Sequence, residues 1–244
     1  MKPRLLDLFC CAGGAGMGYA RAGFEVVGVD VKPQPRYPFE FVQADVLALE
    51  PAFLAGFDAI HASPPCQFAT ELNSNRSAHL NLIPRTRAML KASGLPYVIE
   101  NVRGARDHLD CPVSLFGQMF GLHLVTSQGQ RFDLSRERLF ETNWDLEAPP
   151  HGLSGYPIAN VFGGHLRARS GPYRTGKGTG RTRDFIGEDK PALARALMGM
   201  PWASMGEMSE AIPPAYTEHI GKQLLAHLAS LRQPAWPLRQ RTSQ

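Results

Sequence analysis

Residues 4–20, with the sequence RLLDLFCCAGGAGMGYA, decide the fold class that we predict for this chain. The mainly apolar run Leu5–Phe9 is typical of a strand that is buried on both faces. A glycine-rich turn follows it, and Gly16–Ala22 has helix-compatible spacing. Such a turn lets the backbone approach a ligand at the helix N-terminus. Taken alone, the stretch is equally consistent with a purely structural turn.

The same alternation of apolar runs and helix-compatible stretches continues as far as Val102. The segments that we expect to be strands are Leu5–Phe9, Phe24–Asp30, Phe39–Val42, Phe57–His61 and Tyr97–Val102. The segments that we expect to be crossover helices are Gly16–Ala22, Val46–Ala55 and Leu82–Ser93. This order predicts an α/β fold with a mostly parallel, doubly wound sheet.

Beyond Val102 the pattern changes. Leu122–Thr126 and Arg138–Trp144 look like two further strands, which we interpret as a terminal antiparallel hairpin of the sheet. Gly163–Arg183 contains six glycines, six Lys or Arg and no acidic residue, so we predict that it builds no core of its own. Ala192–Met198 and Ala215–Leu231 have helical spacing, and the second begins after two prolines.

The bulk composition indicates an ordinary globular protein. The 244 residues are 43% hydrophobic and 20% charged, which suits one catalytic domain with a small appendage. No apolar run is long enough for a bilayer and no signal-peptide pattern opens the chain, so we expect a cytoplasmic protein. The four cysteines lack metal-ligand spacing, and we predict reduced thiols and no metal. A net charge of +4 suits a polyanionic partner.

Two carboxylates stand at the ends of expected strands, where nucleotide ligands bind in such folds. Asp30 closes the second strand and Asp45 follows the third. A carboxylate at the end of the second strand is placed to hold a ribose, whereas a helix cap or a solvated turn is the alternative for each Asp. Together with the glycine turn they favour a nucleoside-containing cofactor, with Phe9 stacked on its base.

A cysteine follows the fourth expected strand, in the segment Ser63–Gln67, SPPCQ. The two prolines stiffen the loop and hold Cys66 out of the strand ladder. A cysteine is more often a small buried hydrophobe, but this position favours a nucleophile. The next strand ends in Glu100 and Asn101, which bring a carboxyl and an amide to the same edge. Glu100 is either a structural acceptor or a group that hydrogen-bonds a heterocycle.

A third polar block, Arg136-Glu137-Arg138, precedes another expected strand. Its two guanidinium groups could bind a base edge or phosphates, and a solvated charged turn is the alternative. These blocks, in this order, resemble the DNA (cytosine-5) methyltransferase family. The matching segments are Asp7–Gly14, Pro64–Gln67, Glu100–Val102, Arg136–Arg138 and Ala211–Tyr216. The second is the most specific, and the resemblance spans the chain except about residues 145 to 190.

The resemblance implies a Rossmann-like class I methyltransferase sheet, a short irregular target-recognition segment, and a reaction with a flipped cytosine. The Cys66 thiolate would add to C6, and C5 would then take the methyl group of S-adenosylmethionine. Glu100 would contact N3 and the exocyclic amine, and Arg138 would contact O2. Asn101 would hold the cysteine loop, while Arg136 would contact the DNA backbone or that loop.

Further roles follow from the same resemblance. The residues assigned to S-adenosylmethionine, with S-adenosylhomocysteine as product, are Phe9, Gly13, Gly14, Asp30, Asp45, Pro65 and Ala215. The residues assigned to double-stranded DNA are Gln67, Thr70, Arg167, Arg169, Arg174, Lys177, Arg181 and Arg183. The expected state is a monomer. Because the recognition segment is short, we expect a short or degenerate sequence context, as in a solitary phage or mobile-element enzyme.

The resemblance also divides the chain. We expect a catalytic and cofactor-binding domain at 1–144, a basic glycine-rich recognition segment at 145–190, a C-terminal helical part at 191–232 and a flexible tail at 233–244. Several positions depart from the family pattern. Cys11 stands where glycine is usual, Leu134 where glutamine is usual and Pro214 where some relatives have asparagine, and Phe68-Ala69-Thr70 replaces a small residue followed by Phe and Ser. These departures indicate a divergent branch of the family.

Three other functions stay open. An RNA (tRNA) cytosine-5 methyltransferase fits the same blocks, and the basic segment does not discriminate between the substrates. A non-catalytic DNA- or cofactor-binding protein is a second alternative, although Cys66, Glu100 and Arg138 are all retained. A redox protein ranks lowest, because the chain has no Cys-x-x-Cys motif.

Overall fold

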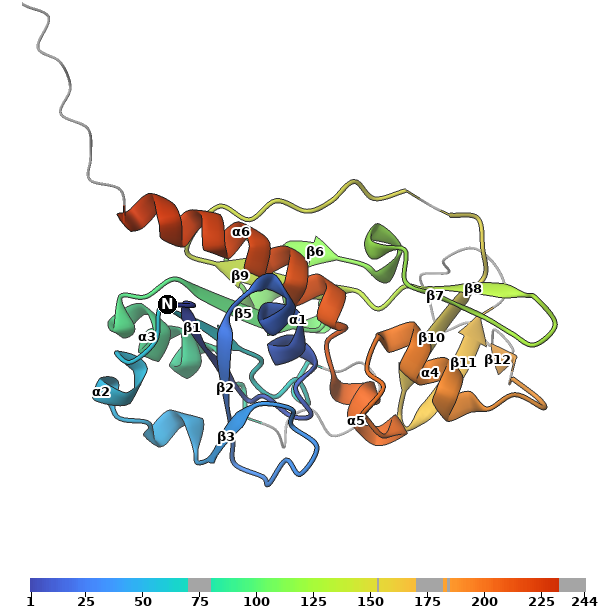
Figure 1. Ribbon diagram of the computed structural model, residues 1–244, viewed down its shortest axis with the longest axis horizontal. Helices are drawn as coiled ribbons and strands as arrows, with labels where there is room; N and C mark the ends of the chain where they lie inside the picture. The colour runs from blue at the N-terminus through green and yellow to red at the C-terminus, as the bar shows by residue number, and fades with distance from the viewer. Residues whose placement is uncertain (70–79, 153, 170–181, 184, 233–244) are drawn as a thin grey trace, which may run out of the picture.

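The computed structural model describes residues 1–69, 80–152, 154–169, 182–183 and 185–232 (Figure 1). The described strands form two sheets. Seven form the first, in the order β3-β2-β1-β4-β5-β9-β6, and five form the second, in the order β12-β11-β10-β8-β7. The two sheets lie at opposite ends of the molecule in Figure 1, and the long helix α6 runs along the first.

The first sheet confirms the predicted mostly parallel α/β architecture. Its parallel strands are β1 (Arg4–Leu8), β2 (Glu25–Asp30), β3 (Glu40–Gln43), β4 (Ala59–Ala62) and β5 (Tyr97–Asn101). Four of the five are buried along nearly their whole length, which explains their almost continuous hydrophobicity. The antiparallel part consists of β9 (Arg138–Thr142), which pairs with β5, and β6 (Val113–Leu115), which pairs with β9.

Helices cover both faces of this sheet. On one face lie α1 (Gly14–Ala22) and α6 (Pro214–Arg232), which pack against each other. The other crossover connections contain α3 (Ile83–Ser93) and two short pieces, η1 (Val46–Ala48) and α2 (Pro51–Leu54). The single helix that we predicted over Val46–Ala55 is therefore divided. The proline ring of Pro51 explains this, because it suits only the first turn of a helix.

The second sheet corrects the predicted strand pairing. It consists of β7 (His123–Val125), β8 (Arg131–Leu134), β10 (Ile158–Phe162), β11 (His165–Arg169) and β12 (Thr182–Arg183). The predicted hairpin between Leu122–Thr126 and Arg138–Trp144 is wrong, since β7 pairs with β8 whereas β9 pairs with β5 and β6. The second sheet thus begins with β7, before β9 of the first sheet in the chain.

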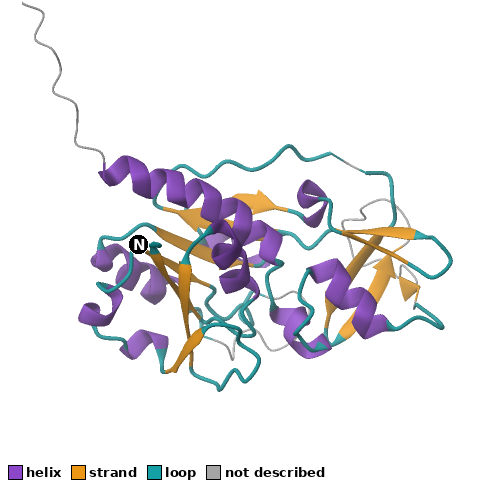
Figure 2. Ribbon diagram, viewed as in Figure 1, coloured by secondary structure: helices purple, strands orange, loops and turns teal. Residues whose placement is uncertain are grey.

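The segment that we expected to be irregular contributes to a core. Val161, Leu166 and Ala168 are buried at alternate positions of β10 and β11. They pack with side chains from α4 (Lys190–Met198) and α5 (Met205–Glu210), which lie against this sheet (Figure 2). Composition alone missed this core, because its apolar partners come from other parts of the chain, both earlier and later. Two 3-10 segments, η3 (Arg103–His108) and η4 (Gly117–Phe120), complete the described elements.

Gly18 sets how closely α1 and α6 approach. A Cβ atom at this position would collide with the Thr217 hydroxyl and the Pro214 carbonyl, and it would lie 2.6 Å from the Glu218 nitrogen. We expect Gly18→Ala to lower the free energy of unfolding by about 1–3 kcal/mol, because backbone must move. Urea denaturation measures this change. The matched control is Gly206→Ala, where no atom lies within 4 Å of the new Cβ. Equal stability of Gly18→Ala and the wild type would contradict close helix packing.

Candidate active site

Strand alternation gathers polar groups on one face of the first sheet. Along β1, β4 and β5, apolar residues one position away from Asp7, His61 and Glu100 pack into the core on the far side of the sheet, and the polar residues take the α1–α6 side. Asp7 lies opposite Gly28 on β2 and opposite His61 on β4. All three polar side chains are buried. They lie toward the carboxyl ends of parallel strands, where ligands bind in such sheets.

The first loop is held by Asp30, at the end of β2. Its two carboxylate oxygens accept hydrogen bonds from the backbone N–H groups of Cys11, at 3.1 Å, and Lys32, at 2.9 Å. Cys11 has φ 44 and Phe9 has φ 57, both in the left-handed region that favours glycine. The family resemblance places glycine at Cys11, and this backbone conformation gives the physical reason. The thiol is partly exposed.

Tyr37 is a residue of this region that the sequence analysis missed. Its buried ring lies against Gly13, Gly16 and Gly28, and a Cβ atom on any of the three would strike it. Its hydroxyl donates a hydrogen bond of 3.1 Å to Oδ2 of Asp7. The cluster of glycines on facing elements was the only signal in the sequence. Burial raises the pKa of Asp7 to about 8, since desolvation outweighs this hydrogen bond.

The groups at the ends of β1, β2 and β3 fit a nucleoside. Phe9 is partly exposed at the end of β1, so its ring can accept a stacked base. Asp45 is exposed and caps η1 through a 2.9 Å hydrogen bond from the Leu47 N–H to Oδ1. Each oxygen of Asp30 accepts one backbone hydrogen bond and keeps a second lone pair. Two carboxylates and an aromatic ring at adjacent strand ends suit a ribose diol and a base amine.

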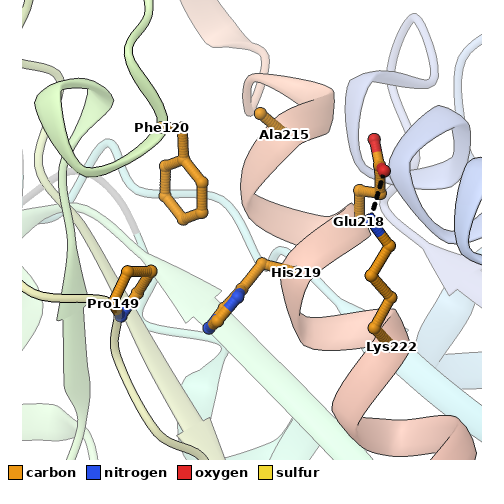
Figure 3. A pocket seen from close by; sticks show the side chains of 6 residues that line it. All are labelled: Phe120, Pro149, Ala215, Glu218, His219 and Lys222. Atoms are coloured by element: carbon orange, nitrogen blue, oxygen red, sulfur yellow. Dashed lines mark hydrogen bonds and ion pairs between the residues drawn. The ribbon is translucent and has the colours of Figure 1, made fainter.

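The segment Ala211–Thr217 contacts the start of α1, just after the glycine-rich loop. The Ile212 carbonyl and the Ala211 side chain face Gly14, and the Thr217 hydroxyl donates a 2.8 Å hydrogen bond to the Ala15 carbonyl. Ala215, which we assigned to the cofactor, lines a separate hollow of about 260 Å³ (Figure 3). The other residues lining that hollow are Phe120, Pro149, Glu218, His219 and Lys222. Ala215 lies on another side of α6 than Pro214 and Thr217 because successive residues of a helix point in different directions.

The cysteine loop is tied to the end of β5. Asn101 is buried, and its Nδ2 donates a hydrogen bond of 2.9 Å to the Pro64 carbonyl. This is the contact that we expected for Asn101. The Ala69 N–H donates to the Cys66 carbonyl at 2.9 Å, which turns the chain just after the cysteine. Cys66 and Pro65 are partly exposed and Gln67 is exposed.

Glu100 and Arg138 form a buried ion pair beside this loop. Arg138 Nε lies 3.0 Å from Glu100 Oε1, and the two side chains are 13% and 8% exposed. Burial raises the pKa of Glu100, while the positive charge of Arg138 and a hydrogen bond from Ser63 oppose that rise. A carboxyl group under such opposing influences is suited to exchange a proton with a heterocycle.

Arg136 corrects an expectation. Its guanidinium is buried and donates hydrogen bonds of 2.6–3.0 Å to the carbonyl oxygens of Val161, Met208, Ser209 and Ala211. We had predicted that it contacts the DNA backbone or the Cys66 loop. In the structure it instead joins β10 of the second sheet to the last turn of α5 and to Ala211, which follows it. Desolvation lowers the pKa of Arg136 to about 9, and the group stays charged at neutral pH.

The predicted DNA-binding cations are only partly described. Arg167, on β11, lies over the ring of Phe162 with its Cζ 5.1 Å from the ring centroid. Arg169 and Arg183 belong to β11 and β12. Thr70, Arg174, Lys177 and Arg181 lie outside the described residues. Within the described part of the chain, no cluster of three His, Cys, Asp or Glu could hold a metal ion, and no helix has the length and apolarity to span a bilayer.

Comparisons with known proteins place this fold. No family model and no curated protein matches the chain. A structure described as a DNA modification methyltransferase encoded within an E. coli prophage is similar at a TM-score of 0.60 and 17% identity, over 93% of this chain and 99% of that one. This chain has a methyltransferase fold.

Two further structures support this conclusion. Spodoptera frugiperda DNMT2 is similar at a TM-score of 0.56 and 12% identity, over 93% of this chain and 99% of that one. S. pombe Dnmt2 is similar at a TM-score of 0.55 and 13% identity, over 95% and 100% of the two chains. The matched part of this chain, 93–95% of its length, is too large to leave out either sheet. Both sheets therefore belong to the shared methyltransferase fold, and the fold class predicted from the sequence is confirmed.

The role of Arg136 can be tested by stability. Lysine cannot reproduce the guanidinium fork, so we expect Arg136→Lys to lower the free energy of unfolding by about 2–4 kcal/mol, because buried carbonyls lose their donors. Urea denaturation measures the loss. The control is Arg103→Lys, at a half-exposed arginine whose Nε lies 3.8 Å from Glu137, where we expect a change within about 0.5 kcal/mol. Equal stability of Arg136→Lys and the wild type would contradict the structural role of this guanidinium.

The raised pKa of Asp7 predicts that the stability of the protein depends on pH. The folded protein keeps this carboxyl protonated up to a pKa of about 8, whereas its ordinary value is 3.8. Its contribution is therefore complete below pH 4 and is lost as the pH rises toward 8, by about 1.4 kcal/mol per pH unit. Asp7→Asn cannot titrate, so we expect the unfolding free energy of the wild type minus that of this variant to fall as the pH rises from 5 to 8. Parallel urea titrations at these pH values measure it, and a constant difference would contradict a buried neutral carboxyl.

Proposed function

We propose that this chain transfers a methyl group from S-adenosylmethionine to C5 of cytosine in DNA, through a covalent bond between Cys66 and C6 of a flipped base. One observation carries the proposal. Asn101 tethers the proline-stiffened loop of Cys66 at the sheet edge where the buried Glu100–Arg138 pair lies. A thiol, a carboxyl of raised pKa and a guanidinium together are the groups that addition to a cytosine ring requires.

The chain's own residues have distinct tasks in this reaction. The Cys66 thiolate forms the S–C6 bond, and the electron pair of the C5–C6 double bond moves toward C5 and N3. Glu100 donates a hydrogen bond to N3 and accepts one from the exocyclic amine, which stabilises the charge that develops on the ring. Arg138 contacts O2. After C5 has been methylated, a base removes the C5 proton, and the S–C6 bond breaks as the double bond forms again.

The cofactor would be held at the ends of β1, β2 and β3. Phe9 would stack on its base, while Asp30 and Asp45 would accept hydrogen bonds from the ribose and the base amine. Gly13 and Gly14 would allow the backbone to approach, and the Ile212 carbonyl closes the start of α1 beside Gly14. When bound there, S-adenosylmethionine supplies the methyl group.

DNA is the proposed substrate for two reasons. The prophage protein of similar fold is described as a DNA modification methyltransferase, and the glycine-rich segment of this chain carries six cations without an acid. Such cations neutralise phosphates with little regard to sequence. Because the expected recognition segment is short, we propose recognition of a short context, two or three bases long.

The first experiment measures transfer of labelled methyl from S-adenosylmethionine to unmodified duplex DNA and, in parallel, to transfer RNA, followed by nucleoside mass spectrometry. We expect 5-methyldeoxycytidine from DNA. We also expect Cys66→Ser to abolish turnover and to leave cofactor affinity nearly intact, since the hydroxyl is a far weaker nucleophile than the thiolate. Cofactor binding is measured by calorimetry.

The matched control is Cys111→Ser, at an exposed cysteine, which should retain full activity. Label in RNA alone would move the substrate to RNA. No transfer to either nucleic acid, together with intact cofactor binding, would favour a non-catalytic binding protein. Methylation by pure Cys66→Ser protein would refute the assignment of the nucleophile.

A further inference from the structure

A chain of buried polar groups leads from α1 to Glu100. The Tyr19 hydroxyl lies 3.0 Å from Nδ1 of His61, and Nε2 of His61 lies 2.9 Å from Oγ of Ser63. The Ser63 side chain is hydrogen-bonded to the Glu100 carboxylate, whose Oε1 also contacts Arg138. Tyr19 and His61 are completely buried. Four side chains from α1, β4, the cysteine loop and β5 thus form one hydrogen-bonded series.

The chemistry of the series fixes its direction. Burial lowers the pKa of His61 to about 3, so its ring is neutral and carries one N–H and one lone pair. The hydrogen bond from Ser63 lowers the pKa of Glu100, which is the effect of a donor to the ionised carboxylate, so Ser63 donates to this group. The Ser63 oxygen is then free to accept the N–H of His61 Nε2, and the Nδ1 lone pair accepts the Tyr19 hydroxyl. Each donor points toward Glu100, and His61 prevents the Ser63 hydroxyl from donating elsewhere.

We propose that Ser63, oriented by the buried pair Tyr19–His61, is a positioning residue that holds the Glu100 carboxyl for its contact with the target base. Two donors from different sides then fix the carboxylate, Ser63 from the cysteine loop and Arg138 from β9. Since Ser63 lies three residues before Cys66, the same loop presents the nucleophile and orients the carboxyl. The proposal rests on the proposed function only for the identity of the base.

A titration of Glu100 tests the series without any substrate. Glutamate labelled with ¹³C at the carboxyl is incorporated, the Glu100 signal is assigned with Glu100→Gln, and its midpoint is followed by NMR. Ser63→Ala removes a donor to the ionised form, so the neutral form persists and the midpoint should rise by about one pH unit. Ser63→Thr retains the hydroxyl and should return the midpoint to the wild-type value. The control is Ser93→Ala, whose hydroxyl bonds only the Leu90 carbonyl and the Leu95 N–H.

None of the other charged or titratable residues near Glu100 is substituted in these variants. The charged or titratable groups that act on it, or on which it acts, are Arg138, Arg136, Tyr19, Tyr216 and Cys11. His61→Phe is the second arm, because it keeps the ring but cannot donate to Ser63. It should raise the midpoint by less than Ser63→Ala does. Equal midpoints in the wild type and Ser63→Ala would contradict the hydrogen bond from Ser63 to Glu100. A midpoint unaffected by His61→Phe would contradict the proposal that His61 orients Ser63.

The methyl-transfer assay tests the positioning. At saturating cofactor, Ser63→Ala should lower kcat about tenfold and leave KM for DNA within about twofold, while Ser63→Thr should restore most of the rate. A raised midpoint with unchanged kcat would overturn the positioning role. If the wild type methylates neither DNA nor RNA, the proposed function fails, and the Glu100 titration alone still decides whether Ser63 and His61 hold this carboxyl.

Discussion

The buried charge of Arg136 is the constraint on which the arrangement of the two sheets depends. A guanidinium removed from water is costly unless protein groups replace the lost hydration. Here the replacement comes from carbonyls of β10 and of the segment around α5, while the Tyr216 hydroxyl on α6 donates to the Arg136 carbonyl at 2.8 Å. These contacts fix the start of β9 relative to the second sheet and to α6. Since Arg138 is the first residue of β9, they also help to place its side chain against Glu100.

Successive side chains of a strand point to opposite faces of the sheet, and this alternation explains why polar residues gather on one face of the first sheet. Apolar residues such as Leu6 and Ile60 face the core with α3, whereas Asp7 and His61 take the α1–α6 side. Hydrogen bonds connect the buried polar groups on that side. One joins Tyr37 to Asp7, and two others join Tyr19 through His61 to Ser63. Oδ1 of Asp7 has no hydrogen-bond partner among the described residues, which is consistent with a neutral carboxyl.

Particular elements show where sequence reasoning succeeded and where it failed. The strand at Tyr97–Asn101 was predictable, because a strand buried on both faces is apolar almost throughout. The pairing of β9 was not predictable from the sequence. Residues 122–126 and 138–142 have similar patterns of apolar and polar residues, and only packing decides which strand each one joins. Composition also hid the core of the second sheet. Leu166 and Ala168 are embedded in a basic, glycine-rich sequence, and their apolar neighbours on α4 come more than twenty residues later.

The sequence by itself determined the α/β order of the first sheet and the set of polar residues at its strand ends, among them Asp30, Cys66 and Glu100. Local periodicity and the position of a residue after a strand suffice for this, since the carboxyl ends of parallel strands share one edge. The tertiary structure alone decided that Arg136 clamps carbonyls and that His61 orients Ser63. The partners of Arg136 lie 25 and 72–75 residues away, and Tyr19 lies 42 residues from His61. Contacts over such separations depend on which faces meet in space, and no local pattern encodes that meeting.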